Sequence, residues 1–443
     1  MMRAISICVR ERSNCHRYDT GDMILEKPKL FLDNREFLIV FGTLAVTLFV
    51  RLTWLYFEYS DFMDKPFYYT KATVLQQYTK NRSGKSYEVL KLKSIEGKKF
   101  YTTALLSDNL TGKIVRVKMI PDKKISFRDY LGTFFVKTRV TVVGESPNSG
   151  KSRVLDRIAL QHQDSQLVSF YQAIFLATPL SITLREKIAG LGVSHLVALS
   201  GFHLTILWGL VYGLLSFIYK PMQQRWFPYR LMLLDMGIVT LGVLGFYLWF
   251  VDFPPSLVRS YTMLSIAWVM LLLGIELISF ELLGFVVMLL LALFPELIVS
   301  LGFRFSVIGV FYIYLVLHWS RQSDKLLISL LYIPVGIFVL MLPIVHEVFG
   351  ITSPWQLLSP LLSLAFVPFY PIVIFLHIIG LGGIFDTALL WLFSLPSIYQ
   401  EHILPQWAVL VYLLLSIASI WSRFFFSLTL STATLYLCYL FVQ

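Results

Sequence analysis

The chain has 443 residues, of which 56% are hydrophobic and only 15% charged, and its mean hydropathy is +0.69. A water-soluble globular protein of this length cannot bury so much apolar surface, so the composition excludes that class and predicts a polytopic α-helical membrane protein. Three cysteines, Cys8, Cys15 and Cys438, lie near the two ends, and this scattered, odd set predicts neither a disulfide framework nor a metal site.

The positive charge is concentrated in one segment. The formal net charge of the chain is +11, and residues 61–160 alone hold 20 Lys and Arg against nine Asp and Glu. The net positive charge of residues 61–160 therefore equals that of the whole chain. We expect a basic domain outside the bilayer, joined to a nearly neutral membrane part.

The chain begins with a polar segment and one apolar run. Residues 1–36 lack the short apolar core of a secretory signal, so we expect a cytoplasmic N-terminal segment. Residues 37–58 are long enough to cross the bilayer once, which takes about 20 residues. Arg51 lies toward the end of this run, where its side chain can reach the headgroups.

Residues 61–150 have a different character. Short segments rich in β-branched and aromatic residues alternate with turn signals such as Asn81–Gly84 and Ser107–Asn109. Their spacing of roughly 8–12 residues predicts a small all-β domain. The candidate fold is a five-stranded OB-type barrel, a fold that binds oligonucleotides. The expected strands are residues 68–76, 87–93, 100–105, 113–119 and 134–143.

From residue 165 to 443 nearly the whole chain is apolar. We expect a multi-span membrane domain here, about 10–11 spans in the chain as a whole, and a re-entrant or interfacial helix at residues 165–190. Prolines such as Pro343, Pro368 and Pro371 are expected to interrupt the apolar runs. The expected spans of this part are residues 194–219, 231–250, 257–275, 282–300, 303–319, 326–345, 357–379, 384–399, 404–420 and 423–442.

The charges of the short loops predict the orientation. Lysine and arginine are enriched in cytoplasmic loops, which places the loops at Lys220–Arg230, Arg321–Lys325 and Arg423 in the cytoplasm. Alternation of the spans then leaves the N-terminus in the cytoplasm and the basic β domain in the periplasm or outside the cell. Long domains translocate largely regardless of their charge. We expect a multi-pass protein of the bacterial inner (cytoplasmic) membrane.

Three polar motifs stand in the apolar part. The first runs from Gly192 to Thr205 and contains His195, Ser200, Gly201 and His203, with a Ser-Gly pair able to break the helix. Ionisable residues in spans usually line a pathway, but histidines bonded to neighbouring helices are an equally good interpretation. The other two motifs place one arginine each at a span entrance, where it either snorkels or lines a polar pore: Arg259 and Arg304.

These motifs together resemble the ComEC-type competence proteins, the channel family that moves transforming DNA across the inner membrane. The sequence GVSHLVALSGFH at residues 192–203 carries the resemblance, supported by residues 255–263, 301–309 and, loosely, 354–363. The resemblance implies an inner-membrane channel for single-stranded DNA import in natural transformation. Many members add a C-terminal metallo-hydrolase domain, for which this chain has no room after its last apolar run. We therefore expect no enzyme, no metal and no cofactor.

In this interpretation the β domain receives DNA, and a periplasmic DNA receptor and a cytoplasmic helicase or DNA-binding protein are the expected partners beside membrane lipid. Lysines would contact the phosphates and aromatic rings would stack on bases. The alternative is ordinary: exposed lysines keep a domain soluble, and strand aromatics form its core. The candidate DNA-binding residues are Lys80, Arg82, Lys85, Lys91, Lys93, Lys98, Lys99, Tyr78, Tyr87 and Tyr101.

Two other function classes compete with the DNA channel. A secondary transporter or lipid-handling carrier, with the β domain docking a partner, also suits broken helices and buried polar residues. The sequence shows no internal repeat, and its extramembrane domain is very basic for a passive cap. A membrane enzyme acting through His195 and His203 lacks a carboxylate partner.

Overall fold

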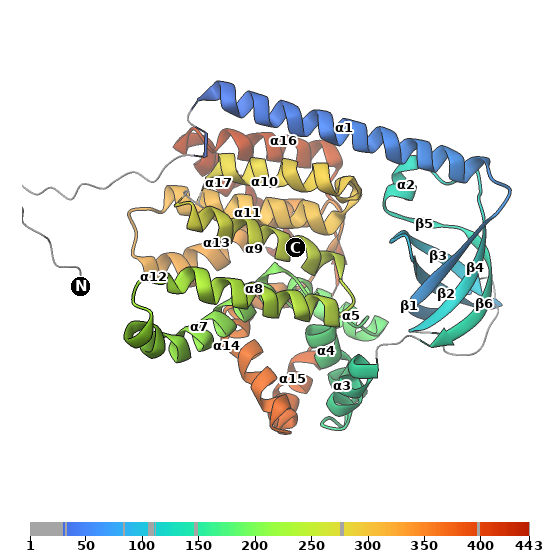
Figure 1. The fold of residues 1–443 in the computed structure, drawn as a ribbon. Helices are drawn as coiled ribbons and strands as arrows, with labels where there is room; N and C mark the ends of the chain where they lie inside the picture. Colours follow the sequence, from blue (N-terminus) through green and yellow to red (C-terminus); the bar gives the residue numbers. More distant parts are fainter. Residues whose placement is uncertain are drawn as a thin grey trace, which may run out of the picture.

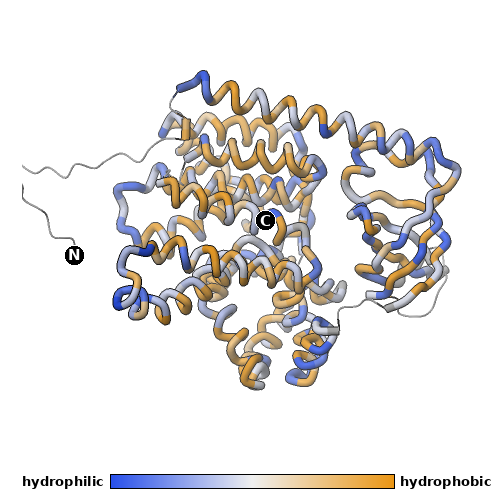
Figure 2. Tube along the Cα trace, in the orientation of Figure 1, coloured by the Kyte–Doolittle hydropathy of each residue, from blue (hydrophilic) through white to orange (hydrophobic). Residues whose placement is uncertain are grey.

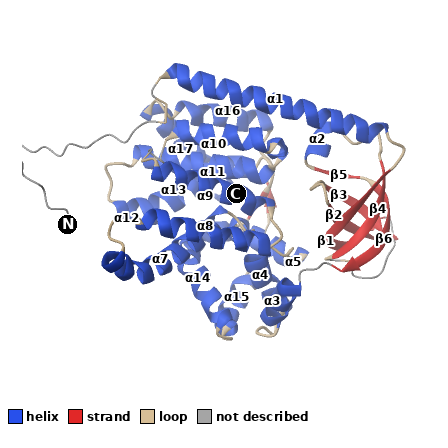
Figure 3. Cartoon of the chain, viewed as in Figure 1, coloured by secondary structure: helices blue, strands red, loops and turns tan. Residues whose placement is uncertain are grey.

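The structure is a computed structural model that describes residues 30–31, 33–82, 85–104, 110, 112–145, 149–274, 279–396 and 399–442. It consists of a helical part and a β domain at one side (Figures 1 and 3). Helix α1 (Asn34–Asp64) runs along the helical part and ends at the β domain (Figure 1). The membrane and β parts predicted from composition are therefore both present.

The β domain is one six-stranded sheet. Its order is β5-β3-β2-β1-β4-β6, antiparallel except for the β3–β5 pair. Alternating side chains build its core, as in β4, where Val115, Val117 and Met119 are buried while Arg116 is exposed. The elements are β1 (Tyr68–Arg82), β2 (Lys85–Ser94), β3 (Lys99–Ala104), β4 (Lys113–Ile120), α2 (Phe127–Leu131), β5 (Thr133–Phe135) and β6 (Lys137–Glu145).

The closed five-stranded barrel is not confirmed. The ladder is open, and its two edges are β5 and β6. These edges are consecutive in the chain and flank Val136, whose N–H donates to the Tyr101 carbonyl at 3.0 Å. The Thr102 and Thr138 hydroxyls add a bond of 2.7 Å between β3 and β6. The predicted fifth strand is thus split at Val136 into one piece beside β3 and one beside β4.

Helix α1 is anchored in the β domain. Its 31 residues extend about 46 Å, more than the hydrocarbon core of about 30 Å, so its last turns project beyond the bilayer. There Phe62 joins the core of the β domain, and the Tyr59 hydroxyl donates to the Ile125 carbonyl at 2.7 Å. Lys98 pairs with Glu58 at 3.2 Å and bonds the Tyr130 hydroxyl. These contacts hold the sheet at a set position beside the membrane part.

The helical part is built to cross a membrane. Among the described residues, seven helices are long and apolar enough to span a bilayer, and four apolar helices are shorter. Apolar residues predominate along most of these helices (Figure 2), and on α1 Leu38 and Phe49 are 67% and 71% exposed, as lipid-facing side chains are. The chain is thus a multi-pass membrane protein, with seven of the 10–11 expected spans at full length.

The helical elements are shorter and more numerous than expected. Residues 165–190 form two short helices, and the span expected at 384–399 contains a helix of eight residues. The elements are α3 (Ser149–Ala159), α4 (Ser165–Leu176), α5 (Ile182–Gly190), α6 (Ser194–Val197), α7 (Gly201–Trp226), α8 (Met232–Phe250), α9 (Pro255–Leu272), α10 (Phe280–Leu293), η1 (Pro295–Val299), α11 (Leu301–Trp319), α12 (Lys325–Leu327), η2 (Ile328–Tyr332), α13 (Ile333–Val345), β7 (Ile351–Thr352), η3 (Pro354–Leu358), α14 (Ser359–Ile378), η4 (Gly382–Phe385), α15 (Asp386–Phe393), β8 (Gln400–Glu401), α16 (Gln406–Ala418) and α17 (Arg423–Val442).

The prolines do not all interrupt helices. Pro343 lies inside α13, and Pro368 and Pro371 lie inside α14, which continues through both for 20 residues. A proline within a helix removes one backbone hydrogen bond but does not have to end the helix where neighbouring segments pack around it. Pro255, by contrast, begins α9, a position that suits its missing N–H.

Candidate nucleic-acid interface

Six of the ten predicted DNA-binding residues lie on one face of the sheet. Strand register places Lys91 opposite Tyr101 and Lys93 opposite Lys99, all on the side away from buried Leu90 and Leu92. The Lys91 ammonium lies 5.5 Å from the centre of the Tyr101 ring. We call this set the inner basic face, because β3 lies on the side of the helical part (Figure 1). Its members are Tyr78, Tyr87, Lys91, Lys93, Lys99 and Tyr101.

The other four candidates have different positions. Lys98 is engaged with Glu58 and Tyr130 at the junction with α1, so its role is to hold the β domain in place. Lys80 and Arg82 lie at the end of β1 and Lys85 at the start of β2, but their side chains lie outside the described part of the structure.

Lys99 has an altered charge equilibrium. Burial, followed by repulsion from Lys91 and Lys93, lowers the pKa of Lys99 to about 8. Lys99 is therefore mostly charged at pH 7, and the ammonium loses its charge as the pH rises through about 8. A phosphate contact from this lysine is available at pH 7 and mostly absent at pH 9.

Lys99→Gln is expected to weaken binding of a fluorescent oligonucleotide at pH 7 but to change it little at pH 9. At pH 7 the slope of log K against log salt should fall by about 0.7, the value for one phosphate contact with a single strand. Fluorescence anisotropy at both pH values measures this. Arg116→Gln is the matched control, since a guanidinium keeps its proton at both. Equal weakening by Lys99→Gln at pH 7 and pH 9 would contradict the assignment.

A second basic region, missed at the sequence level, lies on the same side of the sheet, the side away from the core, but over β1, β4 and β6. Register aligns Tyr69 with Lys118 and Lys118 with Arg139 in one row, and Lys71 with Arg116 in the next. The register positions of this face hold five cations and no acidic residue. We call it the outer basic face, because β4 and β6 lie on the side away from the helical part (Figure 1). Its members are Phe67, Tyr69, Lys71, Arg116, Lys118, Lys137 and Arg139.

The aromatic rings of the outer basic face are accessible and lie among the cations. Phe67 is 44% exposed and Tyr69 51% exposed. The Lys118 ammonium lies 4.0 Å from the centre of the Phe67 ring, and the Arg116 guanidinium 5.3 Å from that of Tyr69. Exposed rings between cations are the arrangement that binds single-stranded nucleic acid, with bases on the rings and phosphates on the cations. The period-two alternation Arg116–Lys118 and Lys137–Arg139 was the signal for it in the sequence.

The His-Ser-Gly-His motif forms a break between two helices. Helix α6 ends at Val197, and α7 begins at Gly201 with Ser200 and His203 bonded to each other as a capping box at 3.3 Å. His195 bonds the Ser363 hydroxyl of α14 at 3.2 Å, so it binds a neighbouring helix. His203 is fully buried against Phe366, and its Nε2 has no hydrogen-bond partner among the described residues.

Arg259 lies beside this break. A Cβ on Gly201 would lie 3.0 Å from the Ser260 hydroxyl, so α7 and α9 meet closely at their first turns. Arg259 is 8% exposed, its Nε has no partner among the described residues, and its guanidinium lies 5.9 Å from the Phe303 ring centre at the start of α11. His203 and Arg259 thus each keep a buried nitrogen without a hydrogen-bond partner among the described residues. Both side chains lie near the N-termini of α7, α9 and α11, and helix N-termini favour anions.

Arg304 lies elsewhere. It lines an apolar cavity of about 330 Å³ between η1, α11 and α13, together with Glu347. Arg304 therefore faces this cavity, whereas Arg259 lies beside the break at Ser200 and Gly201.

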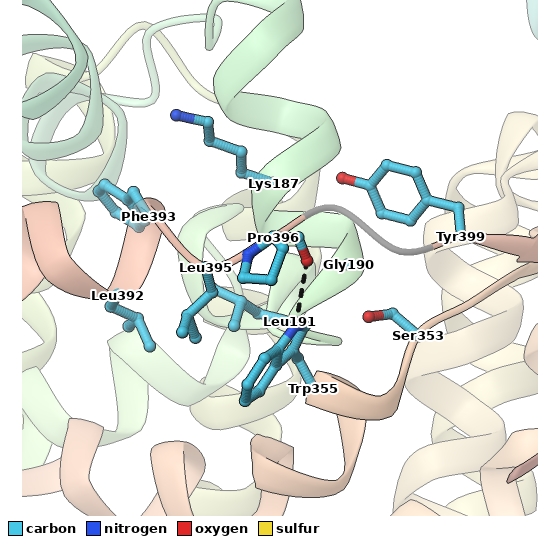
Figure 4. A pocket seen from close by; sticks show the side chains of 10 residues that line it. All are labelled: Lys187, Gly190, Leu191, Ser353, Trp355, Leu392, Phe393, Leu395, Pro396 and Tyr399. Atoms are coloured by element: carbon cyan, nitrogen blue, oxygen red, sulfur yellow. Dashed lines mark hydrogen bonds between the residues drawn. The ribbon is translucent and has the colours of Figure 1, made fainter.

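A smaller hollow lies between α5, η3 and the segment after α15 (Figure 4). Its volume of about 10 Å³ holds about one water. The Trp355 indole N–H donates to the Pro396 carbonyl at 3.0 Å across it, and the Tyr399 hydroxyl donates to the Glu186 carbonyl at 3.1 Å. These bonds hold the segment after α15 against η3 and α5, so the hollow is a packing feature.

Comparison with known proteins gives one match. The sequence model of the competence protein family matches residues 178–442, which is more than half of the chain and includes α6, α7, α9 and α14. No curated protein and no solved structure gives a significant match. The polar motifs around His203 and Arg259 lie within the matched residues. The chain is therefore a member of the competence protein family.

Proposed function

We propose that this chain is the inner-membrane channel that admits a single strand of DNA during natural transformation. Membership of the competence family links it to DNA uptake, and its helices make it a multi-pass membrane protein. The observation that carries the finer proposal is the outer basic face, where exposed Phe67 and Tyr69 lie among five cations. A surface of this kind binds single strands through stacking and phosphate neutralisation.

The route follows from the order of the parts. In our proposal the β domain lies in the periplasm as an OB-type module and receives DNA on its outer basic face. The inner basic face, which is turned toward the helical part, passes the strand on to the break at Ser200 and Gly201. Arg259, whose buried Nε has no partner within the described part of the chain, then contacts the phosphates. A cytoplasmic helicase or DNA-binding protein draws the strand inward, and the chain itself has no enzymatic role.

The alternative, a lipid-handling carrier, is supported by one observation. The cavity beside Arg304 is apolar, of about 330 Å³, and has one cation and one anion in its lining, which suits an amphipathic molecule. The basic charge of the β domain favours the DNA channel, since cations beside accessible rings match the phosphates and bases of a single strand.

The proposal is tested by uptake of fluorescent double-stranded DNA in competent cells that lack this gene. We expect foci that form in the periplasm and never reach the cytoplasm, and transformation that is restored only by the intact gene. Normal cytoplasmic entry and normal transformation in the mutant would refute the channel and leave the lipid carrier to be pursued.

A further inference from the structure

A buried cluster of titratable side chains joins segments far apart in the chain. His162 follows α3, Tyr171 lies in α4, His377 in α14, and Asp386 begins α15. The side chain of His162 is fully buried and that of Asp386 21% exposed. These helices gather at one end of the helical part (Figure 1). The competence-family match begins after His162 and Tyr171, so the cluster connects the matched region to the segment that precedes it.

The hydrogen bonds form a chain across the cluster. His162 Nδ1 lies 2.9 and 3.0 Å from the two carboxylate oxygens of Asp386. His162 Nε2 lies 3.0 Å from His377 Nε2, and His377 Nδ1 lies 2.7 Å from the Val373 carbonyl oxygen. The centres of the two imidazole rings are 5.1 Å apart, so the rings meet nearly end to end and the two Nε2 atoms point at each other.

The number of protons in this chain follows from what each atom can donate. A carbonyl only accepts, so His377 Nδ1 carries a proton. A second proton lies between His162 Nδ1 and Asp386, on one side or the other. A third must lie between the two Nε2 atoms, because two lone pairs cannot bond each other. The cluster therefore holds three protons, one more than an ionised carboxylate and two neutral imidazoles hold.

We propose that Asp386, His162 and His377 form a buried proton-binding site, in which the extra proton holds the α3–α4 segment against α14 and α15. With this proton the group is neutral overall, as a buried group should be. Without it, the site carries a buried negative charge and two opposed lone pairs. A metal ion is the poorer occupant, since the rings meet end to end and no cluster of three His, Cys, Asp or Glu among the described residues is placed to bind one.

The surroundings favour a single titrating unit. The titratable groups facing the cluster are Tyr171, whose ring stacks on His162 at 4.5 Å, and the three members themselves. Within the described ranges no lysine or arginine side chain bonds any of them. Gln161 adds neutral bonds to the same interface: its amide donates to the His377 carbonyl and its oxygen accepts from Gly382 N–H. The protonated link therefore adds to a docking surface that is otherwise independent of pH.

The sign of the pH dependence follows from the proton count. In water near pH 8, a separated carboxylate and two separated imidazoles hold two protons in all, one fewer than the docked site. The state that binds more protons is favoured at lower pH, so docking weakens as the pH rises. A difference of one proton lowers the ratio of docked to undocked protein by at most about tenfold per pH unit. Because α3 and α4 follow the β domain in the chain, this proton sets how firmly that connection is anchored.

Hydrogen exchange of the full chain in lipid nanodiscs, at pH 7 and pH 9 and corrected for intrinsic exchange rates, tests the site in peptides covering residues 161–176. The wild type should lose about tenfold or more of its protection at pH 9. The Asp386→Asn variant should keep its protection at both pH values. Its amide N–H donates to His162 Nδ1, so His162 carries its own proton on Nε2 and donates it to His377 Nε2 without any extra proton. Asp324→Asn, which changes an exposed acid of the α11–α12 loop, should behave as wild type.

A second variant keeps the proposal testable if Asp386→Asn does not fold. His377→Ala removes the acceptor of the shared proton, so it should lower protection equally at pH 7 and pH 9. A wild type without pH dependence, or an Asp386→Asn variant with the wild-type slope, would overturn the proposal. Protection that depends on added Zn²⁺ and not on pH would also overturn it, by placing a metal between the rings.

Discussion

Tyr69→Ala on the outer basic face is expected to weaken binding of a single-stranded oligonucleotide by about 1–3 kcal/mol, the contribution of one stacked base. Tyr69 is about half exposed and lies opposite Lys118 in the strand register, so a base on its ring brings the adjoining phosphates to the cations. Fluorescence anisotropy of the full chain in nanodiscs measures the affinity. Tyr229→Ala, which removes a ring that is 79% exposed in the α7–α8 loop, should change nothing.

The cations of the outer basic face are expected to make binding of the strand depend on the salt concentration. The double variant Arg116→Gln with Lys118→Gln should lower the slope of log K against log salt by about 1.4, since a single-strand contact contributes about 0.7. Lys123→Gln with Lys124→Gln removes the same charge from an exposed loop of the same domain and is the control. An equal effect of the two pairs would show that net charge, and not this face, binds the strand.

Arg259→Met is expected to abolish DNA import while leaving the protein as stable as the wild type, or more so. A cation that is 8% exposed, and whose Nε has no partner in the described ranges, destabilises the fold, and a methionine of similar length removes that cost. Removing one partner of a buried charge pair costs about 2–5 kcal/mol, so loss of the guanidinium is expected to stop passage of the strand. Transformation frequency measures the effect on import, and thermal unfolding in detergent measures the effect on stability.

The control for this position is Arg259→Lys, which keeps the charge but loses the planar guanidinium. It should retain part of the import. Loss of stability together with loss of import in Arg259→Met would instead assign the arginine a structural role, with its guanidinium packed on Phe303. Normal import in the stable methionine variant would remove Arg259 from the path of DNA.

Several features of the fold are predictable because local chemistry dictates them. Apolar runs of about 20 residues must cross a membrane, and alternation such as Val115–Arg116–Val117 must form a strand with one buried face. The break at Ser200 and Gly201 is also local, since a serine with a partner three residues on caps a helix. The charged residues of each segment can be counted directly, which locates the positive charge in the β domain and the segment after it. These rules involve neighbours in the chain, and they hold for the strands, for the helix break and for seven apolar runs that form helices of full length among the described residues.

The tertiary structure alone decided the features that join distant segments. The outer basic face combines Tyr69, Arg116 and Arg139 from three strands whose order, β1-β4-β6, no local pattern specifies. Lys98 pairs with Glu58, 40 positions away, because α1 ends at the β domain. His162 meets Asp386 across 224 positions. Composition and periodicity determined that this chain is a membrane protein with a basic β domain, because burial and alternation act on neighbours. Packing determined which charges are paired, which are exposed and which share a proton, because those depend on distances that no spacing in the chain encodes.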